Sequence, residues 1–104
     1  MTKLEATDDM IIEASQLYKA LSDNTRIKIL TLLSQGERNV SGIVETLGLE
    51  QSNISHQLKL LRHANLVKTR KDGKVVYYSL DDQHVLDILG QTFKHVKHSP
   101  RCKK

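Results

Sequence analysis

Four side chains near the C-terminus are of the kinds that bind metal ions, and their spacing is regular. Asp82 and His84 form an Asp-x-His pair, and after ten intervening residues His95 and His98 form a His-x-x-His pair. If residues 81–98 form one helix, His95 and His98 are neighbours on one face and can chelate a single ion. One carboxylate with three imidazoles is a ligand set that suits zinc or cobalt in four-coordinate geometry.

The two pairs are too far apart to share an ion within one straight helix. His84 lies on nearly the same face as His95, but about 16 Å away along the axis, whereas zinc–ligand bonds are only about 2.0–2.2 Å long. Two antiparallel copies of the helix would bring the Asp-x-His pair of one chain to the His-x-x-His pair of the other. The spacing therefore predicts a homodimer with two equivalent metal sites across its interface. The alternative is a solvated helix with scattered histidines, but three of the five histidines in the chain fall in this arrangement.

The composition indicates one small domain with a basic surface. The chain has 104 residues, a formal net charge of +4 and only 4% aromatic residues. This composition suits a helical fold with a modest core that dimerisation would enlarge, and the charge favours a polyanionic partner. We expect residues 1–98 to form a single domain and residues 99–104, with Arg101, Lys103 and Lys104, to form a mobile basic tail.

Cysteine content and hydropathy favour a cytoplasmic protein. The only cysteine, Cys102, lies in the tail and cannot form an internal disulfide. The N-terminus does not resemble a secretion signal. No stretch approaches the roughly 18 apolar residues that a membrane-spanning helix needs, so we expect no membrane association.

Apolar periodicity and capping residues predict four helices in the first part of the chain. They run over about residues 9–21, from a cap at Ser22 or Asp23 to a stop at Gly36, from Asn39 to Gly48, and over about Gln51–His63.

The period of the apolar residues then changes. Leu66–Lys71 and Lys74–Leu80 are rich in β-branched and aromatic residues. They flank Asp72-Gly73, which predicts a hairpin with a type I′ turn. Ser79 is a capping-box-like start for a last helix that begins near Asp82. The order predicts a mainly α fold with a β-hairpin, arranged as a winged helix-turn-helix.

The last helix carries a broad apolar surface in addition to its candidate metal-binding side chains. The apolar residues are Val85, Leu86, Ile88, Leu89, Phe93 and Val96. Part of this surface must face the rest of the domain, and the remainder is available for a partner helix.

The helix over Gln51–His63 has a polar face typical of DNA recognition. Two short helices joined by a tight glycine-containing turn form a helix-turn-helix, whose second helix enters the major groove. Side chains of Gln and Asn pair with base edges, and the free N–H groups at a helix start suit a phosphate. The polar residues are Gln51, Ser52, Asn53, Ser55, His56, Lys59 and Arg62. An ordinary solvated helix face is the alternative.

The hairpin favours the DNA interpretation, because basic residues crowd its strands and tip. They are Lys68, Arg70, Lys71 and Lys74. Alone, such charges would protect an edge strand against aggregation. Beside a helix-turn-helix, they are where a wing would contact the DNA backbone or minor groove.

At these segments the chain resembles the ArsR/SmtB family of metal-responsive repressors, over about residues 9–98. Residues 21–30 are similar to the family's second-helix signature, residues 51–61 resemble its recognition helix, and the Asp72-Gly73 hairpin looks like its wing. The residues that match the last-helix zinc site of the CzrA-type zinc/cobalt efflux repressors, position by position, are Asp82, His84, His95 and His98.

The resemblance implies a dimer that represses by binding operator DNA, an imperfect inverted repeat, and is released by zinc or cobalt, which derepresses a metal efflux gene. It also implies that a ligand histidine, here His95, hydrogen-bonds backbone near the recognition helix, here His63–Asn65. Residues 41–47 lack the cysteine of the family's other site. This absence weighs against arsenite, lead or cadmium sensing and against cysteine-based redox sensing.

Two other functions fit parts of the sequence. A winged-helix regulator without metal control would keep the DNA-reading surface alone. A zinc-dependent enzyme would need an open coordination position, whereas four protein ligands leave none for a catalytic water. We therefore predict a regulator and not an enzyme, with zinc, cobalt and nickel as the candidate metals.

Overall fold

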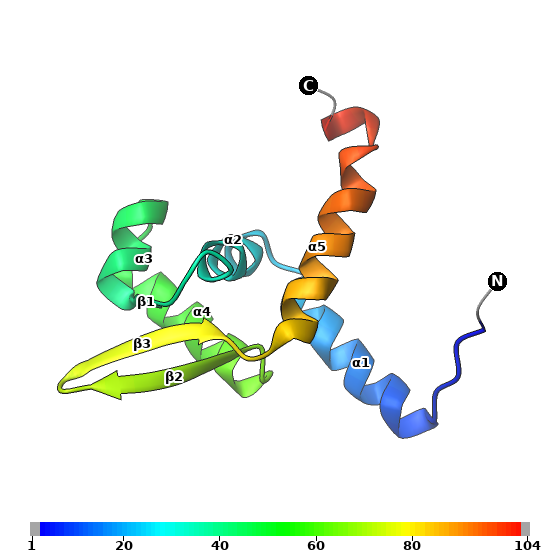
Figure 1. Ribbon diagram of the computed structural model, residues 1–104, viewed down its shortest axis with the longest axis horizontal. Coiled ribbons are helices and arrows are strands. Elements are labelled where there is room, and N and C mark those ends of the chain that lie inside the picture. The colour runs from blue at the N-terminus through cyan, green and yellow to red at the C-terminus, as the bar shows by residue number, and fades with distance from the viewer. Residues whose placement is uncertain (1–2, 103–104) are drawn as a thin grey trace.

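The computed structural model describes residues 3–102, and the molecule is thin and elongated, with extents of 49 × 39 × 20 Å. The elements are α1 (Asp8–Leu21), α2 (Asn24–Leu33), β1 (Arg38–Asn39), α3 (Val40–Leu47), α4 (Gln51–His63), β2 (Val67–Asp72), β3 (Val75–Leu80), α5 (Gln83–Lys97) and a 3₁₀ turn, η1 (Pro100–Cys102). The β2–β3 hairpin projects from one side of the molecule, and α1 and α5 form the opposite side (Figure 1). No helix in the described part of the chain is long and apolar enough to cross a membrane.

The first four helices begin and end close to the predicted positions, and side-chain caps mark the starts of α1, α2 and α3. The side chain of Asp23 accepts a hydrogen bond from the Arg26 amide at 3.0 Å and starts α2. Asn39 caps α3 in the same way, through the Gly42 amide at 2.8 Å. Gly48, with φ of +68°, ends α3 in the left-handed conformation that glycine adopts without steric cost.

The core lies between α2, α3, α4 and the base of the hairpin. Its largest fully buried side chains are Ile29, Leu30, Ile43, Ile54, Leu58, Leu61 and Leu66. Three of these repeat along one face of α4 at helical spacing. Because that face is committed to the core, the opposite face of α4 is left to solvent.

The sheet has the order β1-β3-β2 and is antiparallel throughout. Asp72 pairs with Val75, so the central residues of the turn are Gly73 and Lys74 rather than Asp72 and Gly73. Gly73 has φ of +64°. Lys74 does not have positive φ, because Asn65 is the only non-glycine residue with positive φ among those described. Positive φ at the first central position alone matches a type II′ turn, so the predicted type I′ turn is wrong. Strand β1 was not predicted, since a strand of two residues is too short to show a period.

The last helix is shorter than predicted and starts differently. Ser79 lies within β3, opposite Lys68, and therefore cannot cap a helix. Asp82 is the N-cap instead, and its Oδ1 accepts a hydrogen bond from the Val85 amide at 3.2 Å. At the other end His98 is the C-cap. Two of the four predicted metal ligands thus lie at the two ends of α5 rather than within it.

The predicted division of the apolar residues of α5 is confirmed. Val85 and Leu89 are buried against the domain, while Leu86, Phe93 and Val96 are exposed. Beyond the helix, Pro100–Cys102 form the 3₁₀ turn. The remainder of the predicted tail, Lys103 and Lys104, lies outside the described residues.

Candidate nucleic-acid interface and metal centre

The polar face of α4 is displayed on the surface of the molecule. The exposed members of the predicted DNA-reading set on this helix are Gln51, Ser52, Ser55, His56, Lys59 and Arg62. Asn53 is half-buried. The N-cap, Glu50, makes no side-chain capping bond. The first backbone N–H groups of α4 are therefore not used by a side-chain cap, as a phosphate-binding helix end requires.

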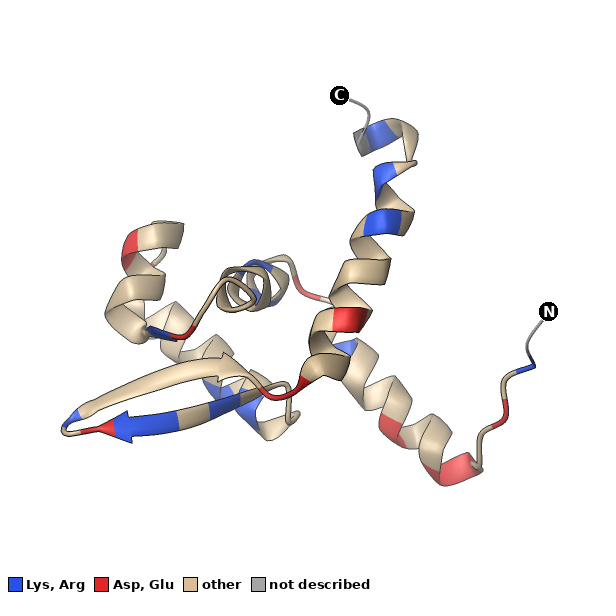
Figure 2. Ribbon diagram, in the orientation of Figure 1, with Lys and Arg blue, Asp and Glu red and all other residues tan. Residues whose placement is uncertain are grey.

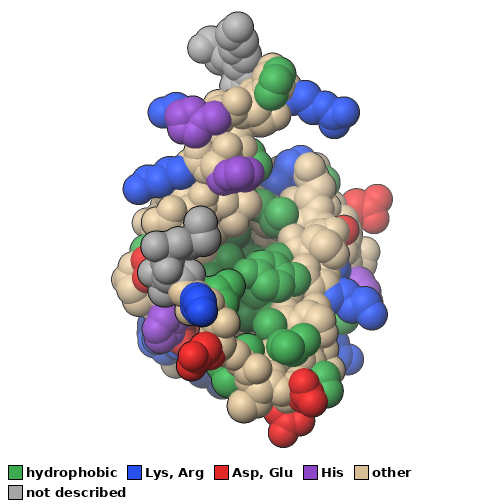
Figure 3. All heavy atoms as spheres, turned by 90° about the vertical axis from the view of Figure 1, so that its right-hand side faces the viewer, with side chains coloured by type: hydrophobic (Ala, Val, Ile, Leu, Met, Phe, Trp, Pro, Cys, Tyr) green, Lys and Arg blue, Asp and Glu red, His purple; other side chains and the backbone are tan. Residues whose placement is uncertain are grey.

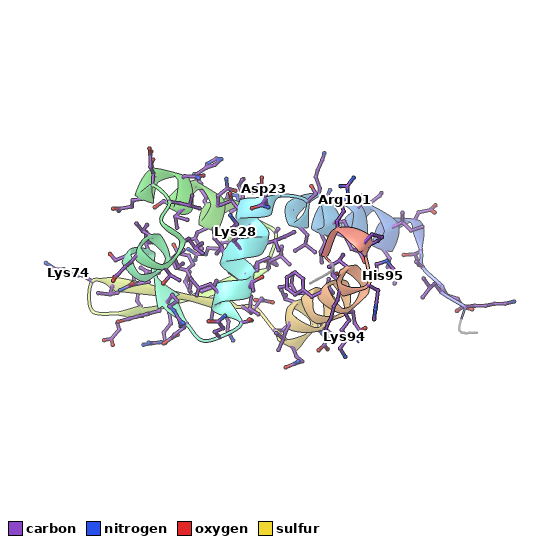
Figure 4. The ribbon with its side chains drawn as sticks, turned by 90° about the horizontal axis from the view of Figure 1, so that it is seen from above. Asp23, Lys28, Lys74, Lys94, His95 and Arg101 are labelled. Carbon is purple, nitrogen blue, oxygen red and sulfur yellow. The ribbon has the colours of Figure 1, made fainter. Side chains whose placement is uncertain are left out.

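Basic side chains from α4 and the hairpin share one edge of the molecule. Figure 2 shows Lys and Arg along β2, at the hairpin tip and on α4, with a second basic group near the end of α5. Lys68, Arg70, Lys71 and Lys74 are all exposed. Lys74 lies at the hairpin tip, far from His95 on α5 (Figure 4).

A depression of about 530 Å³ lies between α4 and the hairpin. Its polar lining comes from Ser55, Lys59, Arg62 and His63 of α4, and from Tyr78 of β3. Two cationic side chains and two hydroxyl groups thus surround one hollow, a combination that suits a phosphate oxygen.

One predicted DNA contact, Arg70, is already engaged within the protein. Its guanidinium donates to both carboxylate oxygens of Glu37, and Nε lies 3.3 Å from Oε2. The guanidinium also lies 4.8 Å from the ring centre of Tyr77 and 3.9 Å from Asp72. The hydrogen bond from Arg70 lowers the pKa of Glu37. Sequence reasoning missed Glu37, because it lies 33 residues from its partner and precedes a strand too short to recognise.

The first predicted ligand pair is assembled at the start of α5. Oδ2 of Asp82 lies 3.5 Å from Nδ1 of His84, and the side chains are 50% and 88% exposed. Partial desolvation raises the pKa of Asp82, but hydrogen bonds from the Val85 amide and from His84 outweigh it and bring the pKa below 3.8. Asp82 is therefore a carboxylate at neutral pH, the form that binds metal.

The second predicted pair lies at the far end of the same helix. His95 and His98 line an open depression of about 440 Å³ together with Val96 and Ser99. Within residues 3–102, no group of three or more His, Cys, Asp or Glu side chains gathers where it could hold a metal ion. Each end of α5 presents two of the predicted ligands, so these residues fit zinc or cobalt only if two chains contribute to each site.

The side of the molecule formed by α1 and α5 carries exposed apolar side chains. Met10, Ile11, Ile12 and Tyr18 of α1 are more than half exposed, and Phe93 of α5 is 41% exposed. Figure 3 shows apolar side chains gathered in a hollow on this side of the molecule. Clustered exposed apolar residues mark a surface that another molecule covers.

Known proteins share this sequence and architecture. Residues 23–69 match the family described as "Bacterial regulatory protein, arsR family". A cadmium resistance transcriptional regulatory protein CadC homolog from Staphylococcus aureus is 41% identical over 85 residues, covering 81% of this chain and 70% of that protein. A transcriptional repressor SmtB homolog from Synechocystis is 33% identical over 91 residues, covering 88% of this chain and 69% of that protein.

Solved structures share the fold over nearly the whole chain. The homodimeric winged helix-turn-helix DNA-binding domain of a possible ArsR-family regulator from Mycobacterium bovis has a TM-score of 0.82 and 25% identity, over 98% of both chains. The fold prediction is thereby confirmed, as is the expectation of a regulator rather than an enzyme. This protein belongs to the arsR family of bacterial regulatory proteins and is a DNA-binding transcriptional regulator with a winged helix-turn-helix fold.

Proposed function

We propose that this regulator is a dimeric metal sensor, which represses a metal efflux gene by binding its operator and is released when zinc or cobalt binds. The observation that carries the proposal is the placement of two exposed ligand pairs at the two ends of α5, a helix that also exposes apolar residues. The protein would act in the cytoplasm, where operator DNA is present.

The exposed apolar residues of α1 and α5 support a homodimer formed through these helices. The related Mycobacterium bovis domain is homodimeric. In an antiparallel pair of α5 helices, Asp82 and His84 of one protomer would join His95 and His98 of its partner. The bound ion would supply four ligand bonds that hold the two helices in one orientation.

The ligand types favour zinc or cobalt over softer metals. Imidazole and carboxylate groups bind these ions well, whereas cadmium and lead prefer thiolates. The chain has a single cysteine, Cys102, far from α3 in sequence. A cadmium site built from several thiolates would need more cysteines than the one in this chain.

For operator binding, we assign base contacts to the start of α4 and phosphate contacts to its end and to the wing. Gln51, Ser52, Asn53, Ser55 and His56 would face base edges. The residues that would contact phosphates are Lys59, Arg62, Lys71 and Lys74. We expect Arg70 to support the wing rather than contact DNA, because Glu37 occupies its guanidinium.

Metal binding would release the regulator from DNA if the metal-bound dimer holds its two recognition helices at a separation that does not match the operator. The two helices must reach successive major grooves, about 34–36 Å apart. A depression of about 410 Å³ supports a further link, because His63 and Asn65 near the end of α4 and Asp82 at the start of α5 all line it, together with residues of α1. His95 of the partner, brought to Asp82 by the metal, would be placed to hydrogen-bond backbone in His63–Asn65.

The decisive test is operator affinity with and without zinc, measured by fluorescence anisotropy on the purified protein. We expect saturating zinc to weaken binding by about 100-fold, a usual size for such coupling. Zinc-independent affinity would overturn the sensor proposal and favour a regulator that metal does not control.

A variant of His95 separates the hydrogen-bond link from metal binding. His95→Asn retains a weak ligand but lacks the second ring nitrogen, so at saturating zinc it should stay on DNA more than the wild type does. If zinc weakens operator binding by this variant as much as by the wild type, the hydrogen bond is not needed. The orientation of the α5 helices alone would then explain release.

A further inference from the structure

A chain of half-buried hydrogen bonds crosses the domain from α1 to the DNA-reading helix. Arg26, in the first turn of α2, donates from Nε to the Ala20 carbonyl at 2.6 Å and from Nη1 to Oε1 of Gln57 at 3.0 Å. Gln57 in turn donates from Nε2 to Oδ1 of Asn53 at 3.2 Å. The chain thus begins at the C-terminal carbonyls of α1 and ends on a residue of the predicted reading set.

The chemistry of the first member sets the direction of every bond that follows. A guanidinium has donors only, so the oxygen of the Gln57 amide must face Arg26. The Gln57 amino group then faces Asn53 and can only donate. Asn53 must therefore accept through Oδ1, which leaves its amino group as the part of the amide that these bonds do not use.

Arg26 is itself held in place, so the direction of the chain is stable. Its guanidinium donates to Ala20 and approaches the Lys19 carbonyl at 3.5 Å, both in the last turn of α1. The Lys19 carbonyl also accepts hydrogen bonds from the backbone amide and the hydroxyl of Ser22, at 3.2 and 2.8 Å, and a cation is favoured at this end of a helix. The Arg26 backbone amide is also fixed, as the donor to the Asp23 cap.

We propose that this chain determines the base preference of the regulator by holding Asn53 with its amino group toward the DNA. A free asparagine can rotate its amide and pair with either a donor or an acceptor. A held amino group selects an acceptor in the major groove, such as N7 of either purine, O6 of guanine or O4 of thymine, and disfavours the N4 amino group of cytosine. The inference rests on the proposed role of α4 in reading DNA. Gln57 is a positioning residue that acts through Asn53.

The substitution Gln57→Glu tests the proposal, because it reverses the direction of the last bond with almost no change in shape. The new carboxylate accepts from Arg26 and must also accept from Asn53. The Asn53 amide should turn over and present Oδ1 to the DNA. Selection from a randomised duplex library should then show, at one base pair in each half-site, a change from a base that presents an acceptor toward cytosine, which presents only the N4 amino donor. We expect the affinity for the wild-type operator to fall about tenfold.

Two further variants separate this effect from charge repulsion and from misfolding. The added negative charge weakens binding to all sequences, but it cannot change which base is preferred. In an Asn53→Ala background, Gln57→Glu should retain the general weakening and lose the change in base preference. Gln57→Met removes both bonds without adding charge and should broaden the preference at the same base pair, which keeps the test available if Gln57→Glu fails to fold.

The outcomes distinguish this inference from the proposed function. If the wild type selects no defined sequence, the DNA-reading role of α4 is wrong and the inference falls with it. If the wild type and Gln57→Glu select the same base at every position of a defined operator, the proposed function stands and the inference is overturned. A change in preference that persists in the Asn53→Ala background would also overturn it, because Gln57 would then act through another residue.

Discussion

At the scale of single residues, the carboxylate of Asp82 serves two partners. Oδ1 caps α5 through the Val85 amide, and Oδ2 lies beside His84. We therefore expect a substitution that removes this side chain to change helix stability as well as the proposed metal binding. The two contributions can be separated, because asparagine is as good an N-cap as aspartate but carries no charge.

We expect Asp82→Asn and Asp82→Ala both to weaken zinc binding, but only the alanine variant to lower the free energy of unfolding. Zinc titration and thermal unfolding of the metal-free protein measure the two effects separately. Equal losses of stability in the two variants would mean that Asp82 does not act as a cap in solution.

The Glu37–Arg70 pair is the second residue-scale feature with a testable role. If it holds the wing, Arg70→Gln and Glu37→Gln should each weaken operator binding by up to about fivefold, the range of an exposed ion pair. The double variant should be no weaker than either single one. If Arg70 instead contacts a phosphate, Glu37→Gln would strengthen binding and Arg70→Gln would reduce the salt dependence.

The pH range of this pair follows from the lowered pKa of Glu37, whose ordinary value is 4.5. A carboxyl group with a pKa lowered by folding stabilises the protein fully above its unfolded-state pKa, and that contribution is lost as the pH falls through the folded-state value. We expect NMR titration of the Glu37 carboxyl to show an inflection below 4.5 in the wild type, and a return toward 4.5 in Arg70→Gln.

At the scale of elements, α4 and the wing are expected to contribute differently to DNA binding. α4 presents short hydrogen-bonding groups above a buried apolar face, whereas the wing presents lysines. Hydrogen bonds to base edges discriminate between sequences, whereas phosphate contacts increase affinity for all of them.

His56→Ala should therefore weaken operator binding much more than binding to random DNA, and zinc affinity should stay unchanged. Lys74→Ala should weaken both kinds of DNA binding alike and reduce the slope of log affinity against log salt by about one. Binding curves over a range of salt concentrations distinguish the two. Loss of zinc binding in His56→Ala would mean that this residue is a metal ligand instead.

At the scale of the whole molecule, the wing and the candidate ligands of α5 lie on different sides. The hairpin is at one side of the molecule, and α1 and α5 form the other (Figure 1). A dimer formed through α1 and α5 would keep both reading surfaces free and would complete both metal sites at once. Dimerisation, zinc binding and tight operator binding are therefore expected to fail together.

Phe93→Glu tests this dependence by placing a charge on the exposed apolar part of α5. We expect sedimentation to show monomers that retain their helical content, bind zinc weakly and lose about 100-fold or more in operator affinity, because two-site binding is lost. The matched control is Gln91→Glu, which adds the same charge about 160° away around the helix. A monomer that still binds one zinc per chain tightly would contradict the shared site.

The positions of the helices could be read from the sequence because local interactions determine them. Asp23, Asn39 and Gly48 act on the adjacent backbone, and the apolar period of α4 appears in its own sequence. The candidate ligand pairs were also visible, because the members of each pair are close in sequence. Their separation along one helix was enough to predict that one chain alone would not complete a four-ligand site.

The tertiary structure decided features that depend on residues far apart in the chain. Ser79 pairs with Lys68 and therefore lies in a strand, so Asp82 and not Ser79 caps the start of α5. The sequence could not show that Glu37 occupies Arg70, 33 residues away, or that Arg26 contacts Gln57, 31 residues away. Those contacts form only when the wing packs beside β1 and α4 packs on α2. Local spacing thus predicted which residues are candidates to read DNA and bind metal, whereas long-range packing decided which of these candidates the protein already holds in place.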